Sequence, residues 1–284
     1  MKKITLIAIT CIASHVLFAQ RLHLNVLGGI SNYGGDLQDK GFTFHQSKPA
    51  IALGMSYEIS DKFFLRSEYS FTKLGADDAQ SKIYSHYLRN LNFKTVLQEL
   101  NLLAEYDILN NYTHQLTPYV FAGIGVFRYS PYTYDSTGKK NYLLGLHTEG
   151  QNLSAYPDRQ QYNKTQINIP VGAGIKVALS DDVKIAAELG FRNLFTDYLD
   201  DVSTNYPDLS LLGPRAAYLS YRGDELKPSV PFPGEGAIRG NPKVKDNYYF
   251  LMLRLTYRLP FKTGYSTSNT HNGNTHRGCP PVKL

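Results

Sequence analysis

Hydrophobic and polar residues alternate with a period of two in eight segments of this chain, each roughly ten residues long. Residues 50–59 show the pattern plainly, with Ile51 and Leu53 on one face and Ala52 and Gly54 on the other. Such alternation is typical of β-strands, because successive side chains point to opposite faces, and this length suits a tilted strand that crosses a bilayer. The predicted strands are residues 22–32, 50–59, 63–73, 93–107, 117–129, 166–179, 183–196 and 247–259.

The connections between these strands alternate between short and long. The short ones are residues 60–62, 108–116 and 180–182, and the long polar ones are residues 33–49, 74–92, 130–165 and 197–246. This rhythm is typical of outer-membrane barrels, which have short periplasmic turns and long outer loops. We therefore predict an all-β fold, an eight-stranded antiparallel transmembrane β-barrel with long extracellular loops and both termini in the periplasm.

Two features favour a membrane barrel over a soluble antiparallel barrel or sandwich, which also alternates. First, tyrosines gather near the ends of the predicted strands, as an interfacial aromatic girdle requires. The expected girdle residues are Tyr57, Tyr69, Tyr106, Tyr119, Tyr129, Tyr249 and Tyr257. Second, the polar strand faces carry charges of both signs, whereas a soluble barrel places apolar side chains inside.

The charged residues on the polar faces are expected to fill the barrel. Eight strands enclose an interior just wide enough for side chains, and unpaired buried charge is costly. We therefore predict a lumen closed by a salt-bridge network that serves folding and forms no pore. The predicted members are Glu58, Arg66, Glu68, Glu99, Glu105, Lys176, Glu188, Arg192, Arg254 and Arg258.

The first residues are typical of a cleaved signal peptide. Lys2 and Lys3 give the positive start, an apolar run follows at residues 4–13, and Ala19 offers a small residue for cleavage. Leu17 does not match the small residue expected before the cleavage site, so the exact site stays open. The predicted domains are a signal peptide at 1–19, an outer-membrane barrel at 20–261 and a flexible periplasmic tail at 262–284.

The tail is rich in Thr, Ser, Asn, Gly and His, and its low apolar content predicts disorder. Because Cys11 leaves with the signal peptide, Cys279 is the one cysteine of the mature chain. A single thiol forms no internal disulfide, so Cys279 is free, modified or bonded to another protein. We predict that the tail binds a periplasmic partner near Arg277 and Cys279; an idle tail with a free thiol is the alternative.

Charge and loop composition narrow the function further. The net charge of +6 is spread along the chain without a block of Lys or Arg, so we expect no nucleic-acid partner.

Four aspartates follow the seventh strand and could form a Ca²⁺ site: Asp197, Asp200, Asp201 and Asp208. Their spacing lacks the EF-hand pattern, and Asp side chains that bond backbone amides in a loop are the simpler interpretation.

An enzymatic interpretation rests on His45 and Ser47, since some small barrels are lipid A deacylases that use Ser and His. Nucleophilic catalysis needs a base within hydrogen-bond reach and usually a third orienting group. These two residues lie in a predicted loop beside Lys48 and Pro49 rather than on a lipid-facing strand. The sequence therefore predicts no catalytic residue, no cofactor and no resident metal.

Several motifs occur in order from the first strand to the last. Residues 31–37 read SNYGGDL, residues 88–95 read LRNLNFKT, and residues 147–151 read HTEGQ. The exit of the seventh strand, residues 191–203, reads FRNLFTDYLDDVS, and residues 238–242 read IRGNP. This ordered set resembles the PorG-like outer-membrane barrels of Bacteroidota, and the strand-seven exit is its most specific part.

The resemblance implies a role as well as a fold. The best-described member of that family is a component of the type IX secretion system, which exports proteins across the outer membrane and supports gliding in some species. That member associates with a periplasmic ring made of a lipoprotein and its partner. By resemblance, we expect a non-enzymatic barrel that contacts this ring and the outer-membrane lipids. The alternative is a stand-alone barrel that acts in adhesion, envelope stability or passage of small ligands.

Overall fold

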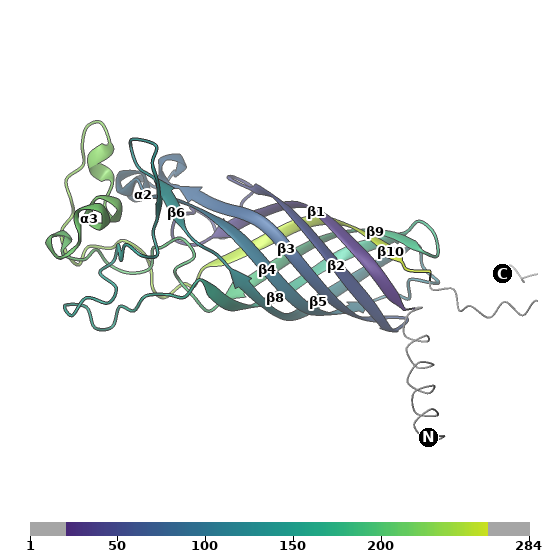
Figure 1. Cartoon of the computed structure of the whole chain (residues 1–284). Coiled ribbons are helices and arrows are strands. Elements are labelled where there is room, and N and C mark those ends of the chain that lie inside the picture. Colours follow the sequence, from purple (N-terminus) through teal and green to yellow (C-terminus); the bar gives the residue numbers. More distant parts are fainter. Residues whose placement is uncertain (1–20, 261–284) are drawn as a thin grey trace, which may run out of the picture. The chain divides into compact units, whose positions relative to one another are not determined.

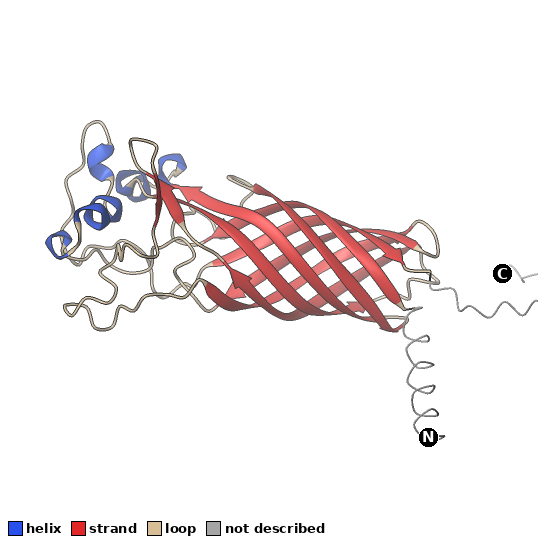
Figure 2. Ribbon diagram, in the orientation of Figure 1, coloured by secondary structure: helices blue, strands red, loops and turns tan. Residues whose placement is uncertain are grey.

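The computed structural model describes residues 21–260, and Arg21–Leu259 forms one compact unit. The predicted signal peptide at 1–19 and the predicted tail at 262–284, with Arg277 and Cys279, lie outside the described residues. Within the compact unit, antiparallel strands close into a barrel, and the long loops gather at one end of it (Figures 1 and 2). No helix in the described part of the chain is long and apolar enough to cross a membrane.

Eight long strands form the barrel and agree with the eight predicted segments to within four residues at each end. They are β1 (Leu22–Gly34), β2 (Lys48–Ser60), β3 (Phe63–Asp77), β4 (Asn92–Asp107), β5 (Leu116–Arg128), β8 (Thr165–Ala178), β9 (Val183–Leu194) and β10 (Asn247–Arg258). Each long strand pairs with its neighbour in the chain, and β1 pairs with β10 to close the ring. The predicted eight-stranded antiparallel barrel is confirmed.

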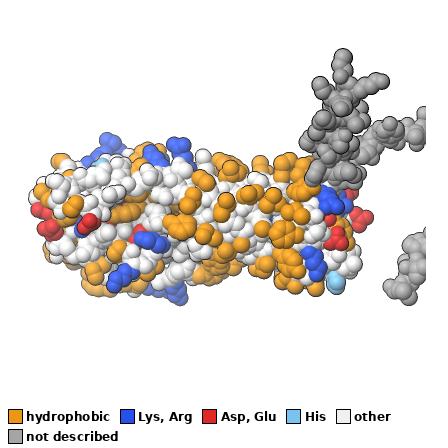
Figure 3. Space-filling view, turned by 90° about the horizontal axis from the view of Figure 1, so that it is seen from below, with side chains coloured by type: hydrophobic (Ala, Val, Ile, Leu, Met, Phe, Trp, Pro, Cys, Tyr) orange, Lys and Arg blue, Asp and Glu red, His pale blue; other side chains and the backbone are white. Residues whose placement is uncertain are grey.

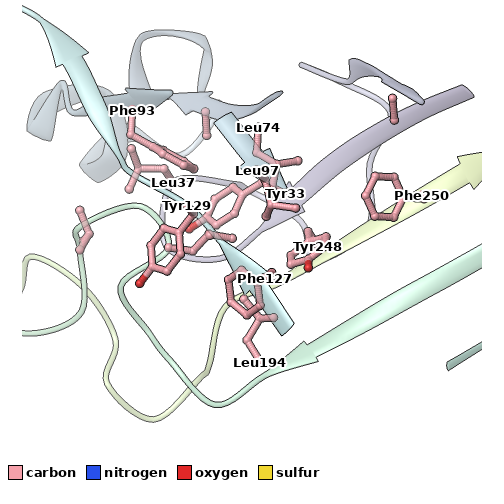
Figure 4. Close-up of a cluster of buried hydrophobic side chains, with 14 of the residues drawn as sticks. Tyr33, Leu37, Leu74, Phe93, Leu97, Phe127, Tyr129, Leu194, Tyr248 and Phe250 are labelled. Carbon is pink, nitrogen blue, oxygen red and sulfur yellow. The ribbon is translucent and has the colours of Figure 1, made fainter. Parts of the chain in front are cut away.

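The four long connections are folded, and we call their residues 35–47, 78–91, 129–164 and 195–246 the cap. They contain η1 (Asp78–Gln80), α2 (Tyr84–Arg89), β6 (Tyr132–Tyr134), β7 (Lys140–Tyr142), η2 (Leu209–Leu211), α3 (Pro214–Ser220) and η3 (Gly223–Glu225). Tyr132 of the β6–β7 hairpin pairs with Lys94, so the hairpin extends the wall beyond the ring. Large buried side chains from the strand ends and the cap form one hydrophobic cluster (Figure 4).

The two faces of the barrel wall differ sharply in polarity. On β4, Leu100 and Leu102 point outward and are 57% and 46% exposed, whereas Glu99, Asn101 and Glu105 are buried inside. Apolar side chains also cover the barrel wall on the face drawn in Figure 3. Such a large contiguous apolar surface is rare on a soluble monomer, whereas a lipid-facing barrel needs it. The wall is therefore built to contact lipid.

The prediction of an interfacial tyrosine girdle is right for four of its seven residues. Its outward-facing, accessible members are Tyr57, Tyr69, Tyr106 and Tyr257. The prediction is wrong for Tyr119, which is buried in the lumen, and for Tyr129, which is buried in the cap cluster. Tyr249 is also buried, because the ring of Phe42 lies 4.7 Å from its own ring. Nearness to a strand end does not decide which face a side chain occupies; strand parity and loop cover do.

Glycine makes room for an aromatic ring at one point of the lumen. A Cβ atom on Gly174 would lie 2.5 Å from the Cζ of Tyr119 and 2.7 Å from the carbonyl oxygen of Ala187. A Cβ atom on Gly28, by contrast, would meet nothing within 4 Å. The two glycines therefore form a matched pair, one at a crowded inward site and one at an open outward site.

We expect Gly174→Val to lower the free energy of unfolding by about 1–3 kcal/mol, because it overpacks a filled interior. Gly28→Val is the control and is expected to change it by less than about 0.5 kcal/mol. Urea unfolding of the protein refolded in lipid vesicles measures both. Equal unfolding midpoints for the two variants would contradict the close contact between Gly174 and the Tyr119 ring.

Candidate functional site: the filled lumen and the cap

Charged side chains from four strands occupy the centre of the lumen. The guanidinium of Arg66 lies 2.5 Å from Glu68, 2.6 Å from Glu105 and 3.1 Å from Glu188, measured to the nearest carboxylate oxygens. Arg254 lies 2.8 Å from the Oε2 atom of Glu105, the same oxygen that Arg66 contacts. All five side chains are at most 6% exposed. Two guanidinium groups thus link three buried carboxylates across the barrel.

The network continues toward the short turns. The Nζ of Lys176 lies 2.5 Å from Glu105 and 2.7 Å from Asp107. At the rim, Arg258 lies 3.6 Å from Glu58 and is partly exposed. Asp107 is absent from the sequence prediction, although it has the same strand parity as Glu105. That shared parity was the available signal for it.

A second cluster lies toward the cap. Arg192 is 3.4 Å from Glu99, and its guanidinium stacks over the ring of Phe250 at 4.4 Å. The Oε1 of Glu99 also accepts hydrogen bonds from the amide of Asn168 at 2.7 Å and from the hydroxyl of Tyr248 at 3.0 Å. Together the two clusters place every residue of the predicted network in an ion pair inside the barrel or at its rim.

The packing of the lumen leaves almost no free volume between these clusters and the short turns. A cavity of about 10 Å³ lies there, lined by His23, Lys176, Lys184 and Arg254 among others. This volume is about enough for one water molecule. Solutes and hydrated ions therefore find no passage at this level of the barrel.

The cap has a charged core of its own, built from the sequence motifs described above. Arg239 lies 2.7 Å from Glu149, and both are buried. Arg89 lies 2.7 Å from Asp78, donates to the carbonyl oxygen of Asp36 at 2.8 Å and also donates to the carbonyl oxygen of Arg239. Motif residues that are far apart in the chain therefore meet in one place and hold the four long loops together.

Glu149 is the point where two of the longest loops join. Its carboxylate accepts from the backbone amide of Ser203 at 2.9 Å, and from the amide and the hydroxyl of Thr204 at 3.1 Å and 2.9 Å. Arg159 donates to the Glu149 carbonyl oxygen at 2.7 Å. A buried carboxylate with this many donors is fully satisfied, so its role is to position the loops.

The aspartates after β9 are engaged in hydrogen bonds within the cap. Asp200 accepts from the hydroxyl of Tyr33 at 2.5 Å, and Asp246 accepts from the same hydroxyl at 3.1 Å. Asp201 accepts from Tyr162 at 2.6 Å and from the hydroxyl of Thr148 at 2.5 Å. Among residues 21–260, no group of three or more His, Cys, Asp or Glu side chains is arranged to hold a metal ion.

The two remaining aspartates of this group bond within their own loop. Asp197 accepts from the hydroxyl of Ser203 at 2.7 Å. Asp208 precedes η2 and accepts from the backbone amide of Ser210 at 2.9 Å. The simpler interpretation from the sequence, that these side chains organise loops, fits the structure.

Burial changes the acidity of these carboxyl groups. It raises the pKa of Asp201 to about 6, although the Arg239 guanidinium opposes the shift. Burial also raises the pKa of Asp197 to about 6, and raises the pKa values of Asp200 and Asp246 well above the ordinary value for aspartate, each strengthened by neighbouring carboxylates. The cap thus carries acid groups that take up protons slightly below neutral pH.

The serine and histidine of the β1–β2 loop do not form a catalytic pair. The hydroxyl of Ser47 donates to the carbonyl oxygen of Phe44 at 2.8 Å and accepts from the amide of Asn32 at 3.2 Å. The side chain of His45 is exposed. Ser47 is therefore held by backbone and amide groups and lacks the adjacent base that would activate a nucleophile.

A cleft of about 430 Å³ opens on the cap between α2 and residues 230–241. Its polar lining includes Asp36, Arg89 and Asn241, and its apolar lining includes Tyr206 and Ile238. The Tyr206 side chain is buried, and its hydroxyl has no hydrogen-bond partner among the described residues. This volume and mixture of surfaces are typical of small-molecule pockets.

We expect Arg66→Met to lower the free energy of unfolding by about 3–5 kcal/mol, because it leaves three buried carboxylates partly unpaired. Lys73→Met is the control, since Lys73 points outward and is exposed, and it is expected to change stability by less than about 0.5 kcal/mol. Urea unfolding in lipid vesicles measures both variants. Equal losses would exclude a structural role for the network.

We expect the cap to become more stable as the pH falls from 7 to 5. Asp201 has a folded pKa of about 6 and an unfolded pKa of about 3.9, so the folded state binds more protons in this window. The protection factors of the amides at residues 199–204, which correct for the intrinsic slowing of hydrogen exchange at lower pH, are therefore expected to rise by about tenfold for each such group. Asp201→Asn is expected to remove one such tenfold step. An unchanged pH profile in Asp201→Asn would contradict this assignment.

Residues 2–212 match the family described as "Domain of unknown function (DUF6089)", and no curated protein matches the chain. Neisserial surface protein A (NspA) is 11% identical, with a TM-score of 0.43 over 84% of this chain and 97% of that chain. Ail, the attachment invasion locus protein of Yersinia pestis, is 11% identical, with a TM-score of 0.40 over 84% and 97%. The outer membrane protein OprG from Pseudomonas aeruginosa is 10% identical, with a TM-score of 0.41 over 84% and 98%. Because the family match spans more than half of its residues, the chain belongs to the DUF6089 family.

Proposed function

We propose that this protein is a non-enzymatic β-barrel subunit of the outer membrane that associates with the type IX protein secretion and gliding machinery and contacts its periplasmic ring. The observation that carries the proposal is the filled lumen around Arg66, which leaves no passage at the centre of the barrel. A barrel that cannot conduct has to act through its outer wall, its cap or its turns.

The proposed role comes from the resemblance of the sequence motifs to PorG-like barrels. The resemblance rests on an ordered set of motifs, and Arg89, Glu149 and Arg239 of three of these motifs meet in the cap core. A shared structural purpose explains why these residues occur together in one chain. The secretion role is inferred from the resemblance to that family.

The end of the barrel with the short turns is the surface proposed to face the periplasmic ring. A groove of about 310 Å³ lies there between residues 111–115 and residues 178–184. β1 begins and β10 ends at the same end, because His23 pairs with Arg258. The predicted tail, with Arg277 and Cys279, would follow from this end of the barrel and extend the contact.

The proposal is tested in a strain that lacks the gene. Deletion is expected to stop type IX export, and a tagged full-length copy is expected to restore it and to recover the ring lipoprotein and its partner from solubilised outer membranes. A copy that ends at residue 261 tests the tail, and Cys279→Ser, run on non-reducing gels, tests a disulfide to the ring. Intact export after deletion, with no ring protein recovered, would refute the proposal.

The cleft on the cap favours a second candidate, a stand-alone barrel that binds a ligand or another surface. Its volume of about 430 Å³ suits a small molecule. In that case the pull-down recovers no ring protein and deletion leaves export intact. Passage of small ligands is a separate case, tested by planar-bilayer recording of the purified barrel, in which we expect no open-channel current.

A further inference from the structure

The lipid-facing surface ends abruptly on one side of the barrel. Leu100, Val126 and Ile167 lie side by side on β4, β5 and β8, as the last outward apolar row before the cap. Two residues further toward the cap, about 7 Å along the strand, Gln98 pairs with Arg128. On these three strands the wall therefore changes from apolar to polar within one step of the strand register, and Arg128 is the cation of the polar row.

Cations concentrate in one sector of the wall, at the cap ends of β3, β4, β5 and β8 and on the adjoining β7. Its exposed cations are Lys73, Lys94, Arg128, Lys140 and Lys164. None of them forms an ion pair with a carboxylate within residues 21–260. On β9 and β10, by contrast, the paired residues Asn193 and Asn247 at the start of the ladder are neutral. Figure 3 shows cationic side chains where the apolar wall meets the cap on the face drawn.

A groove of about 520 Å³ lies within this sector, just beyond the apolar row. Arg128 and Lys164 line it, together with Val96, Gln98 and Tyr142. The ring of Tyr142 is 56% exposed, and its hydroxyl accepts from the Nζ of Lys140 at 3.1 Å. Hydrogen-bond donors and positive charge thus converge on a space that has no acidic lining residue.

We propose that this groove binds the phosphate-bearing headgroup of a lipid in the outer leaflet, with the acyl chains of that lipid against Leu100, Val126 and Ile167. This inference rests on the proposed insertion in the outer membrane with the cap outside. The planar guanidinium of Arg128 suits a phosphate, since it offers two parallel donors. A lipid is favoured over a free phosphate ion because Gln98 and Arg128, which line the groove, lie only two residues along their strands from the apolar row.

The experiment uses the full chain purified from outer membranes in a neutral detergent. The probes are bisphosphorylated lipid A, the same lipid after removal of its phosphates, and inorganic phosphate, and binding is measured by native mass spectrometry and by thermal shift. Arg128→Gln combined with Lys164→Gln is expected to weaken binding of the phosphorylated lipid by about 30-fold, the effect of two cations at an anionic lipid surface. Lys40→Gln combined with Lys243→Gln removes the same charge from the cap and is expected to leave binding unchanged.

Three outcomes would overturn the inference. The first is equal binding of the lipid with and without phosphates, and the second is an equal loss in the two double variants. The third is competition by millimolar inorganic phosphate as strong as that by the lipid, which would make the groove a site for the free ion. Membrane fractionation distinguishes the lipid-binding proposal from the proposed insertion in the outer membrane. A chain that reaches the outer membrane but does not bind the lipid would contradict only the lipid-binding proposal.

Discussion

The arrangement of the barrel strands depends on the ion pairs that Arg66 forms in the lumen. Eight strands enclose too little space for water to solvate a buried charge, so each inward carboxylate needs a protein partner. Arg66 supplies that partner to Glu68, Glu105 and Glu188, which come from three strands. The shared guanidinium therefore fixes the relative positions of β3, β4 and β9, and the outer faces of these strands are then free to remain apolar.

The cap is also held together by a buried guanidinium that pairs with a carboxylate. The strand ends bring the long loops close together, and Glu149 and Arg239 then satisfy one another and several backbone groups. A loop of this length would remain mobile without such buried contacts. The cap is consequently a folded part of the molecule that shares a hydrophobic cluster with the strand ends, and its cleft has walls of defined position.

Sequence parity was enough to predict the strands, the direction of each side chain along them and the short turns. Nearness to a strand end was the wrong criterion for Tyr119, since its parity places it on the inward face with Thr117 and Phe121. The pairing of individual carboxylates and cations in the lumen could not be predicted either. Several of these residues share the inward face, and only the strand register determines which of them are close enough to pair. The fold of the cap could not be predicted, because α2 and α3 are too short to give a periodic pattern and non-local contacts such as Arg89 with Asp78 position the loops.

A buried network of this kind needs an explanation beyond stability, because a well-packed apolar interior is often as stable as buried ion pairs. The outward face of each strand must be apolar to meet lipid. If Glu99, Asn101 and Glu105 on the inward face of β4 were replaced by leucine, residues 99–106 would become a continuous hydrophobic segment prone to aggregation before insertion. Charges on the inward face keep the unfolded strand soluble, and pairs across the barrel, such as Arg66 of β3 with Glu188 of β9, form only when the barrel closes. The alternation that reveals the fold in the sequence is thus also the feature that lets the chain reach a membrane in an unfolded form.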